Sequence, residues 1–187
     1  MLKFSKMNKT VVFALVVFSL VLSGCFSSVP VKSSSSASSS RATGTVIKEA
    51  EFKKGGTLVI LPFKAGVGAV ANPQLDRVAL MIVKGMIDYL AEQKTPFTVL
   101  STEDQGRPQL VIEGYVNDFS QSGKMSRMIH GKKTTLSVSG QMVVSGTHDR
   151  LFVFQHRRSM TDPKRDGLDV AYQTGQDLGR FIVDALQ

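Results

Sequence analysis

Cys25 is the only cysteine in the 187-residue chain, and its thiol is the side chain whose surroundings point most clearly to a chemistry. A single cysteine cannot form an internal disulfide. It follows two small residues and an apolar run over residues 11–22, which three lysines precede. That run is shorter than the roughly 20 residues that a membrane span needs. Residues 1–24 therefore have the layout of a secretory signal peptide, with Cys25 directly after it.

The stretch Leu22-Ser23-Gly24-Cys25 resembles the lipobox of bacterial lipoproteins. The resemblance implies that the Cys25 thiol receives a diacylglycerol, that the signal is cut before it, and that the new amino end is acylated. Two or three acyl chains anchor a protein stably in a bilayer, whereas a single chain does not. Phe26 stands where an aspartate would resemble an inner-membrane retention signal of enteric bacteria. We therefore expect a protein anchored in the outer membrane and facing the periplasm.

The other residues that could do chemistry form no recognisable site in the sequence. None of the three histidines has a second histidine or a cysteine at metal-ligand spacing. Asp166 and Asp169 fall at the start of an expected helix, where capping and the helix dipole explain acidic residues. Gly66 and Gly68 lack the rest of a phosphate-binding fingerprint, and no nucleophile elbow is present. We expect no metal, no cofactor and no catalytic activity.

A basic connection over residues 120–133 is a second candidate for binding. Its candidate contacts to an anionic surface are Lys124, Arg127, Lys132 and Lys133, with methionines among them. Such a segment could rest on lipid headgroups or an anionic polymer, and a solvated loop explains the same composition. Nucleic acid is disfavoured, because this exported chain has only three tyrosines and no tryptophan for stacking on bases.

Charge gives a modest hint in the same direction. The formal net charge is +8, and removal of residues 1–24 lowers it to +5. An excess of this size fits anionic partners such as phospholipid headgroups or envelope polymers, although a solvated basic face is the commoner cause.

The chain after residue 24 divides into two parts. Residues 25–56 hold the lipidated cysteine and a serine-rich stretch without apolar period, which predicts a flexible tether. Residues 45–52 could instead add an edge strand. Residues 57–187 have the periodicity of a single domain, which must fold without disulfides.

Five strands and two helices are expected in residues 57–187. The strands cover 57–63, 97–100, 109–120, 134–145 and 151–160, and the last two form a hairpin. The helices cover residues 73–93 and residue 166 to the end, each with an apolar stripe. The order β-α-β-β-β-β-α predicts an α/β (α+β) domain, in which two helices lie on one face of a mixed sheet of about five strands.

Small residues on the second helix indicate how the two helices meet. Ala171, Gly175 and Gly179 recur at every fourth position, and glycine costs about 1 kcal/mol in a helix interior. We expect this edge to lie close to the first helix, near Gly85. The apolar stripe of the first helix exceeds half its circumference, so it must meet the sheet and either the second helix or a partner protein.

The element order, together with segments 58–63, 73–93, 97–100, 112–119 and 134–160, resembles the small α/β lipoproteins of the bacterial envelope. That group is related to the amino-terminal domain of TolB, to the curli-secretion lipoprotein CsgG and to the penicillin-binding-protein activator LpoB. Residues 114–131 also resemble a group of uncharacterised lipoproteins. The chain lacks the long amphipathic insertions of CsgG, so a secretion pore is not implied.

Two functions follow as hypotheses. The first is a membrane-anchored, non-catalytic accessory or assembly factor that binds another envelope protein and could form an oligomer. The second is a direct binder of an envelope ligand (anionic lipid headgroups, glycan or peptidoglycan) through the basic connection. Ionic strength separates them, because salt weakens binding to an anionic surface far more than docking through an apolar helix face.

Overall fold

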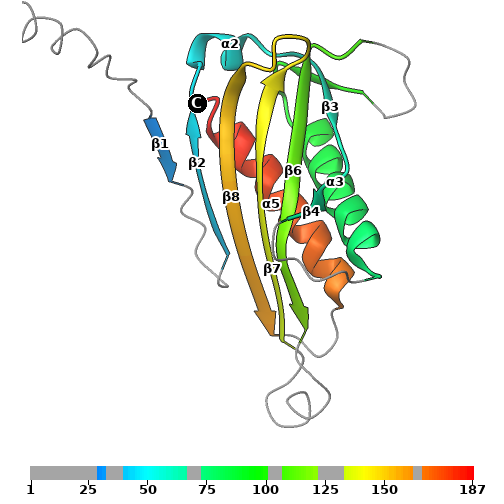
Figure 1. Cartoon of the computed structure of the whole chain (residues 1–187). Helices are drawn as coiled ribbons and strands as arrows, with labels where there is room; N and C mark the ends of the chain where they lie inside the picture. The colour runs from blue at the N-terminus through cyan, green and yellow to red at the C-terminus, as the bar shows by residue number, and fades with distance from the viewer. Residues whose placement is uncertain (1–28, 33–39, 67–72, 101–106, 122–132, 162–165) are drawn as a thin grey trace, which may run out of the picture.

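The computed structural model describes residues 29–32, 40–66, 73–100, 107–121, 133–161 and 166–187. They form one mixed sheet with strand order β1-β2-β8-β7-β6-β3-β5 and with β4 paired to β6 (Figure 1). The strands are β1 (Val29–Lys32), β2 (Arg41–Val46), β3 (Gly56–Ile60), β4 (Lys64–Ala65), β5 (Phe97–Val99), β6 (Leu110–Gln121), β7 (Lys133–Val144) and β8 (Arg150–Thr161). The helices are α2 (Glu49–Lys54), α3 (Leu75–Glu92) and α5 (Gly167–Asp184). Within these ranges no helix is both long and apolar enough to cross a bilayer.

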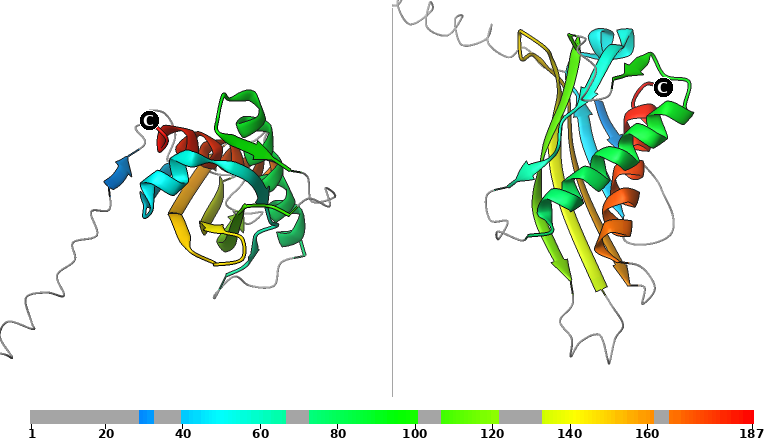
Figure 2. Two further views of the ribbon diagram at one scale, coloured as in Figure 1. Left: turned by 90° about the horizontal axis from the view of Figure 1, so that it is seen from above. Right: turned by 90° about the vertical axis from the view of Figure 1, so that its right-hand side faces the viewer.

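The predicted fold class is confirmed: the domain is α/β, with a mixed sheet and both long helices on one of its faces (Figure 2). Five strands (β3, β5, β6, β7 and β8) and two helices (α3 and α5) occupy the expected positions in the expected order. The element count differs, because β1, β2, β4 and α2 are additional. Each addition is short, six residues or fewer, and short elements give little periodicity to detect.

Residues 41–54 lie inside the fold, whereas the sequence analysis extended the tether to residue 56. β2 pairs antiparallel with β8, and Ala42 and Val46 of β2 are buried. Phe52 of α2 is fully buried, with ring centroids 5.8 Å from Phe97 and 5.4 Å from Phe152. The buried side of β2 holds only alanine, glycine and valine. This weak apolar alternation did not distinguish β2 from the serine-rich stretch before it.

Three antiparallel strands of twelve residues, β6, β7 and β8, form the centre of the sheet. β3 runs parallel to β5 and β6, and α3 lies in the connection from β3 to β5. The core fills the space between this sheet and the two helices. Its largest fully buried side chains from the sheet are Leu58, Ile60, Ile112, Leu136, Met142, Leu151 and Phe152, and those from the helices are Phe52, Ile82, Met86, Leu90 and Phe181. Each such side chain contributes roughly 1.5–3 kcal/mol on burial.

Helices α3 and α5 approach each other through glycines, as expected from the sequence. A Cβ atom on Gly85 would lie 2.1 Å from the carbonyl oxygen of Tyr172, and one on Gly175 would lie 2.1 Å from that of Ile82. Backbone therefore meets backbone at these two positions, where no side chain fits. Gly179 is less crowded, because its nearest neighbours are side-chain atoms of Tyr89 at 3.0 Å.

The start of α5 is closed by a capping box, in line with the interpretation of its acidic residues. The Asp166 carboxylate accepts hydrogen bonds from the backbone N–H groups of Leu168 (2.8 Å) and Asp169 (3.0 Å). The Asp169 carboxylate accepts one from the Asp166 N–H group at 3.0 Å. Both acids therefore cap the N-terminus of α5.

Candidate binding face of the sheet

The two faces of the sheet differ in what lies on them. Helices α3 and α5 lie on one face, which we call the covered face (Figure 2). On the other, the open face, none of the described helices lies (Figure 2). The side chains that β2, β8, β7 and β6 place there are mostly polar: Thr43, Thr45, Gln155, Arg157, Ser137, Ser139, Gln141, Glu113, Tyr115 and Asn117.

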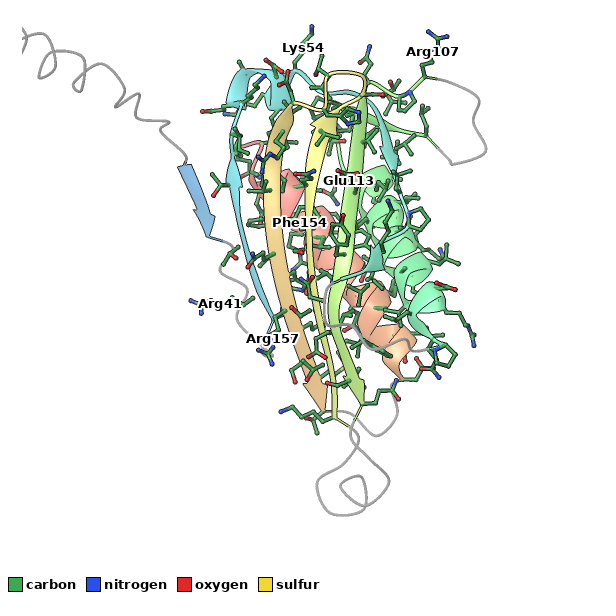
Figure 3. The ribbon with its side chains drawn as sticks, in the orientation of Figure 1. Arg41, Lys54, Arg107, Glu113, Phe154 and Arg157 are labelled. Carbon is green, nitrogen blue, oxygen red and sulfur yellow. The ribbon has the colours of Figure 1, made fainter. Side chains whose placement is uncertain are left out.

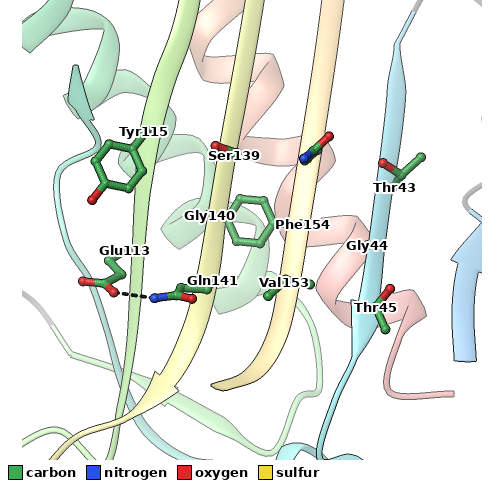
Figure 4. Close-up of a pocket in the computed structure, with 11 residues that line it drawn as sticks. Thr43, Gly44, Thr45, Glu113, Tyr115, Ser139, Gly140, Gln141, Val153 and Phe154 are labelled. Atoms are coloured by element: carbon green, nitrogen blue, oxygen red, sulfur yellow. Dashed lines mark hydrogen bonds between the residues drawn. The ribbon is translucent and has the colours of Figure 1, made fainter. Parts of the chain in front are cut away.

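The open face is hollowed between two rows of cross-strand neighbours. One row is Tyr115–Ser139–Gln155–Thr43, and the other is Glu113–Gln141–Val153–Thr45. Between them lies a depression of about 590 Å³ (Figure 4). Between these two walls runs a row of three glycines and one phenylalanine: Gly114, Gly140, Phe154 and Gly44. The Phe154 ring lies on the covered face, and the glycines have no side chain. The floor of the depression is therefore backbone.

Three glycines in that middle row make room for aromatic rings on the covered face. A Cβ atom on Gly140 would lie 2.4 Å from Cζ of Phe154, and one on Gly114 would lie 2.4 Å from Cε1 of Phe63. One on Gly44 would lie 2.7 Å from Cε1 of Phe181. The rings thus lie directly against the strands. Glycine in a strand interior marks such a close approach.

Hydrogen bonds hold some of the walls in place and leave other groups available. The Gln141 amide donates to Oε1 of Glu113 at 2.7 Å, which orients this carboxylate (Figure 4). Amide and hydroxyl groups of Asn117 and Ser139 bond to each other at 3.0 and 3.3 Å. Tyr115 is 49% exposed, which makes it one of two large hydrophobic side chains exposed in the described part of the chain. The walls therefore combine fixed polar groups with one accessible aromatic ring.

A second depression, of about 370 Å³, adjoins the first and shares Thr43 and Gln155 with it. Its distinguishing residues are Arg41 on β2 and Arg157 on β8, which are direct cross-strand neighbours. Both are exposed and lie at the opposite end of the sheet from Lys54 and Arg107 (Figure 3). Across the described ranges, no ion pair or side-chain hydrogen bond engages either guanidinium.

The covered face holds a contrasting polar cluster between β8 and α5. Asp177 of α5 pairs with Nη1 of Arg158, accepts a hydrogen bond from Ser40 at 2.9 Å, and lies 3.3 Å from Nε2 of His156. Arg158 also donates to Oε1 of Gln173 at 2.8 Å. The His156 contact lacks hydrogen-bond geometry. These contacts tie α5 to the sheet, and His156 within the cluster is only 2% exposed.

Electrostatics in this cluster stabilise the ionised form of Asp177. Burial of the carboxyl group acts to raise its pKa, but His156, the Arg158 charge and the Ser40 hydroxyl outweigh burial and lower that pKa below the ordinary range. The residue is therefore a carboxylate throughout the neutral range.

The residues that the sequence singled out fall mostly outside the described part of the chain. Cys25, Lys124, Arg127 and Lys132 lie there, so the predicted lipidation and the basic connection remain predictions. Lys133 belongs to the described residues. It is exposed, it is the first residue of β7, and it pairs with Thr161 of β8. Within the described ranges, no three side chains of the metal-binding types lie close enough together to hold an ion.

Sequence reasoning missed the open face as a site. The sequence predicted the strands that became β6, β7 and β8 but did not connect them with β2, because residues 41–46 were assigned to the tether. The alternation of polar residues at 41, 43 and 45, matching that of β8, was the signal available. A larger depression, of about 940 Å³, is lined by Phe63, Leu75 and Val116 among others and lies outside the open face.

Comparison with known proteins places the chain by fold alone. No protein-family model and no curated protein sequence matches it. Two solved structures of the PelC dodecamer from Paraburkholderia phytofirmans, one of them a point variant, are each 9% identical to it. The variant match covers 79% of this chain and 97% of that chain with a TM-score of 0.51, and the other covers 80% and 96% with 0.50.

A further solved structure is that of lipoprotein GNA1162 from Neisseria meningitidis. It is 12% identical, and the match covers 65% of this chain and 97% of that chain with a TM-score of 0.41. The likeness to the PelC structures shows a shared α/β fold, and at 9% identity it does not transfer a function. The finer resemblance to TolB, CsgG and LpoB stays a prediction.

Proposed function

We propose that this chain is a lipid-anchored protein of the bacterial envelope that acts by binding, as an accessory or assembly factor for another envelope protein. The observation that carries the proposal is the open face, a polar, hollowed surface across four strands. Behind it, aromatic rings of the core pack directly against strand glycines. Exposed Tyr115, Arg41 and Arg157 belong to the residue types enriched in protein interfaces.

Site-specific crosslinking in cells tests this role. A photoreactive residue at position 115 on the open face should capture an envelope protein. The same residue at position 80 on α3 is the matched control, because Leu80 is 56% exposed and Tyr115 49%. Equal capture from both positions, or capture from neither, would contradict binding through the open face.

The anchor is the second part of the proposal. We expect Cys25 to carry the lipid and the outer membrane to hold it, on the strength of residues 1–25 and of Phe26. Cells fed a fatty-acid analogue should label the wild-type chain but not Cys25→Ala. In an enteric host, Phe26→Asp should move the protein to the inner-membrane fraction. Equal labelling of both chains would remove the anchor from the proposal.

Direct binding of an envelope ligand is the second candidate function. The observation that favours it is the pair Arg41 and Arg157, two exposed cations side by side in a depression. The basic connection is a separate candidate surface: replacing Lys124, Arg127, Lys132 and Lys133 with serine should weaken adsorption to anionic vesicles at low salt without unfolding the domain. Unchanged adsorption would exclude that surface.

Oligomer formation is a further element of the proposal. The PelC structures are dodecamers, and the sequence analysis allowed for an oligomer. We expect light scattering on the purified chain to give a multiple of the mass of one chain that begins at Cys25. A monomeric mass at high protein concentration would contradict this element alone.

A further inference from the structure

We propose that the open face binds an acidic glycan, with Arg41 and Arg157 holding its anionic groups and Tyr115 supporting a sugar ring. The inference deepens the second candidate function above, because it names the ligand class and places its site on the sheet. It does not depend on the basic connection.

The first argument is the arginine pair. Arg41 and Arg157 are direct cross-strand neighbours, and like charges placed opposite each other destabilise a sheet. Arg158, the next residue on β8, differs because its guanidinium is paired with Asp177 and Gln173. Two unpaired guanidinium groups beside a depression lined by Asn117, Ser137 and Gln155 form a site that is complementary to carboxylate or phosphate.

Nearby acids do not neutralise the pair. Asp118 lies in the same row, beyond Ser137, and is joined to neither arginine by an ion pair. Glu113, the other acid that the described strands place on this face, is bonded to Gln141 in the neighbouring depression. Residues 33–39, which precede β2, are serine and alanine only and bring no charge. The positive charge is therefore available to a ligand.

The second argument concerns the adjoining depression. Tyr115 offers an accessible ring, whose apolar body suits the C–H face of a sugar. Gln155, Ser139 and the oriented Glu113 offer donors and acceptors for sugar hydroxyls. Arg157 and Tyr115 are two strands apart, about 10 Å across the sheet. A ligand that reaches both is thus an oligosaccharide and not a single sugar.

Other occupants fit less well. A peptide that adds a strand needs unpaired backbone, whereas the floor strands β7 and β8 are paired on both sides. A lone headgroup phosphate would use the arginines and leave Tyr115 unused. A charged chain of sugars uses both depressions, which share Thr43 and Gln155.

Calorimetry on the full lipidated chain in detergent micelles tests the proposal, with oligogalacturonate as a carboxylated glycan and maltohexaose as its neutral counterpart. We expect oligogalacturonate to bind and maltohexaose not to bind. The double variant Arg41→Gln/Arg157→Gln should bind at least tenfold more weakly. Arg150→Gln is the matched control, because Arg150 is an exposed arginine at the far end of β8 and outside both depressions.

Further probes separate the sources of the anion. Tyr115→Ala should weaken oligogalacturonate binding but leave any binding of inorganic phosphate unchanged. Equal oligogalacturonate affinity in the wild type and the double variant would overturn the proposal. So would binding of phosphatidylglycerol vesicles or inorganic phosphate through the arginines without binding of the glycan. Protein capture from position 115 with no glycan binding would overturn this inference and leave the accessory role standing. Glycan binding with no protein capture would support this inference and contradict the accessory role.

Discussion

Arg157 and Arg158 follow one another on β8 but lie on opposite faces of the sheet, in opposite surroundings. On the covered face, Arg158 meets Asp177 and Gln173 of α5. On the open face, Arg157 meets another arginine, Arg41, in a solvent-exposed depression. The comparison shows one residue type in two situations: where a helix supplies an acid, arginine joins that helix to the sheet, and where no acid is supplied, its charge stays exposed to solvent. Changes on the two faces should therefore have different consequences.

The largest effect is expected on the covered face at Gly175. Gly175→Leu should destabilise the domain by about 3 kcal/mol, because its Cβ atom would meet the α3 backbone and the helices would have to separate. Gly179→Leu should cost less, about 1–2 kcal/mol, since the Tyr89 side chain can move aside. Denaturant unfolding measures both. Equal losses would show that backbone contact does not set the helix spacing.

Removal of each arginine in turn tests the comparison directly. Arg158→Met should destabilise the domain by about 2 kcal/mol, because it leaves the half-buried Asp177 carboxylate without its charged partner. Arg157→Met, one residue away, should change stability by less than about 0.5 kcal/mol. The same unfolding experiment gives both values. A loss for Arg157→Met as large as that for Arg158→Met would erase the distinction between the faces.

Acid should weaken the covered face selectively. The pKa of Asp177 is lower in the folded chain than its ordinary value of about 4, so its contribution is complete above that value and disappears as the pH falls through the folded pKa. The stability gap between wild type and Asp177→Asn should be constant near pH 7 and narrow below about pH 4. Thermal melts across this range measure it, and a constant gap down to pH 2 would show that the pKa is not lowered.

The smallest effect is expected on the open face, and its sign is opposite. Arg41→Gln should stabilise the domain by a few tenths of a kcal/mol, because it relieves the repulsion across the β2–β8 pair. Arg150→Gln lacks such a neighbour and serves as the control. Differential unfolding of the two variants gives the value. Destabilisation by Arg41→Gln would mean that this arginine holds the fold together.

Much of this arrangement could be predicted from the sequence, and the limits have physical causes. Strands β6 to β8 and helices α3 and α5 each span at least twelve residues, so their periodicity identifies both the element and its buried side. β2 escaped prediction because Ala42 and Gly44 bury little apolar surface. Its pairing with β8 is set by contacts 116 positions apart, Arg41 with Arg157.

The open face could not be predicted because its residues are far apart in the sequence. Tyr115, Gln155 and Thr43 come from three strands and meet only through strand register. Their spacing along the chain does not indicate a site. In contrast, the capping box joins Asp166 to Asp169, only three positions apart, so the sequence alone indicated it.

The short strand β1 bears on how the domain stands relative to a membrane. Val29 pairs with Val46, whose row across the sheet includes Phe152 and Met142. Cys25 is four positions before Val29, a distance of at most about 14 Å, so a lipid on Cys25 would attach near this level of the sheet.

From Met142 to Lys133, β7 continues for nine residues, about 30 Å, away from that level. β6 ends at Gln121 and β7 begins at Lys133, both at this far end of the sheet. If Cys25 carries a lipid, an upright domain holds this end well above the anchoring bilayer, beyond the roughly 10 Å range of screened charges. Only a domain lying on its side would bring the lipid and this end of the sheet to one surface.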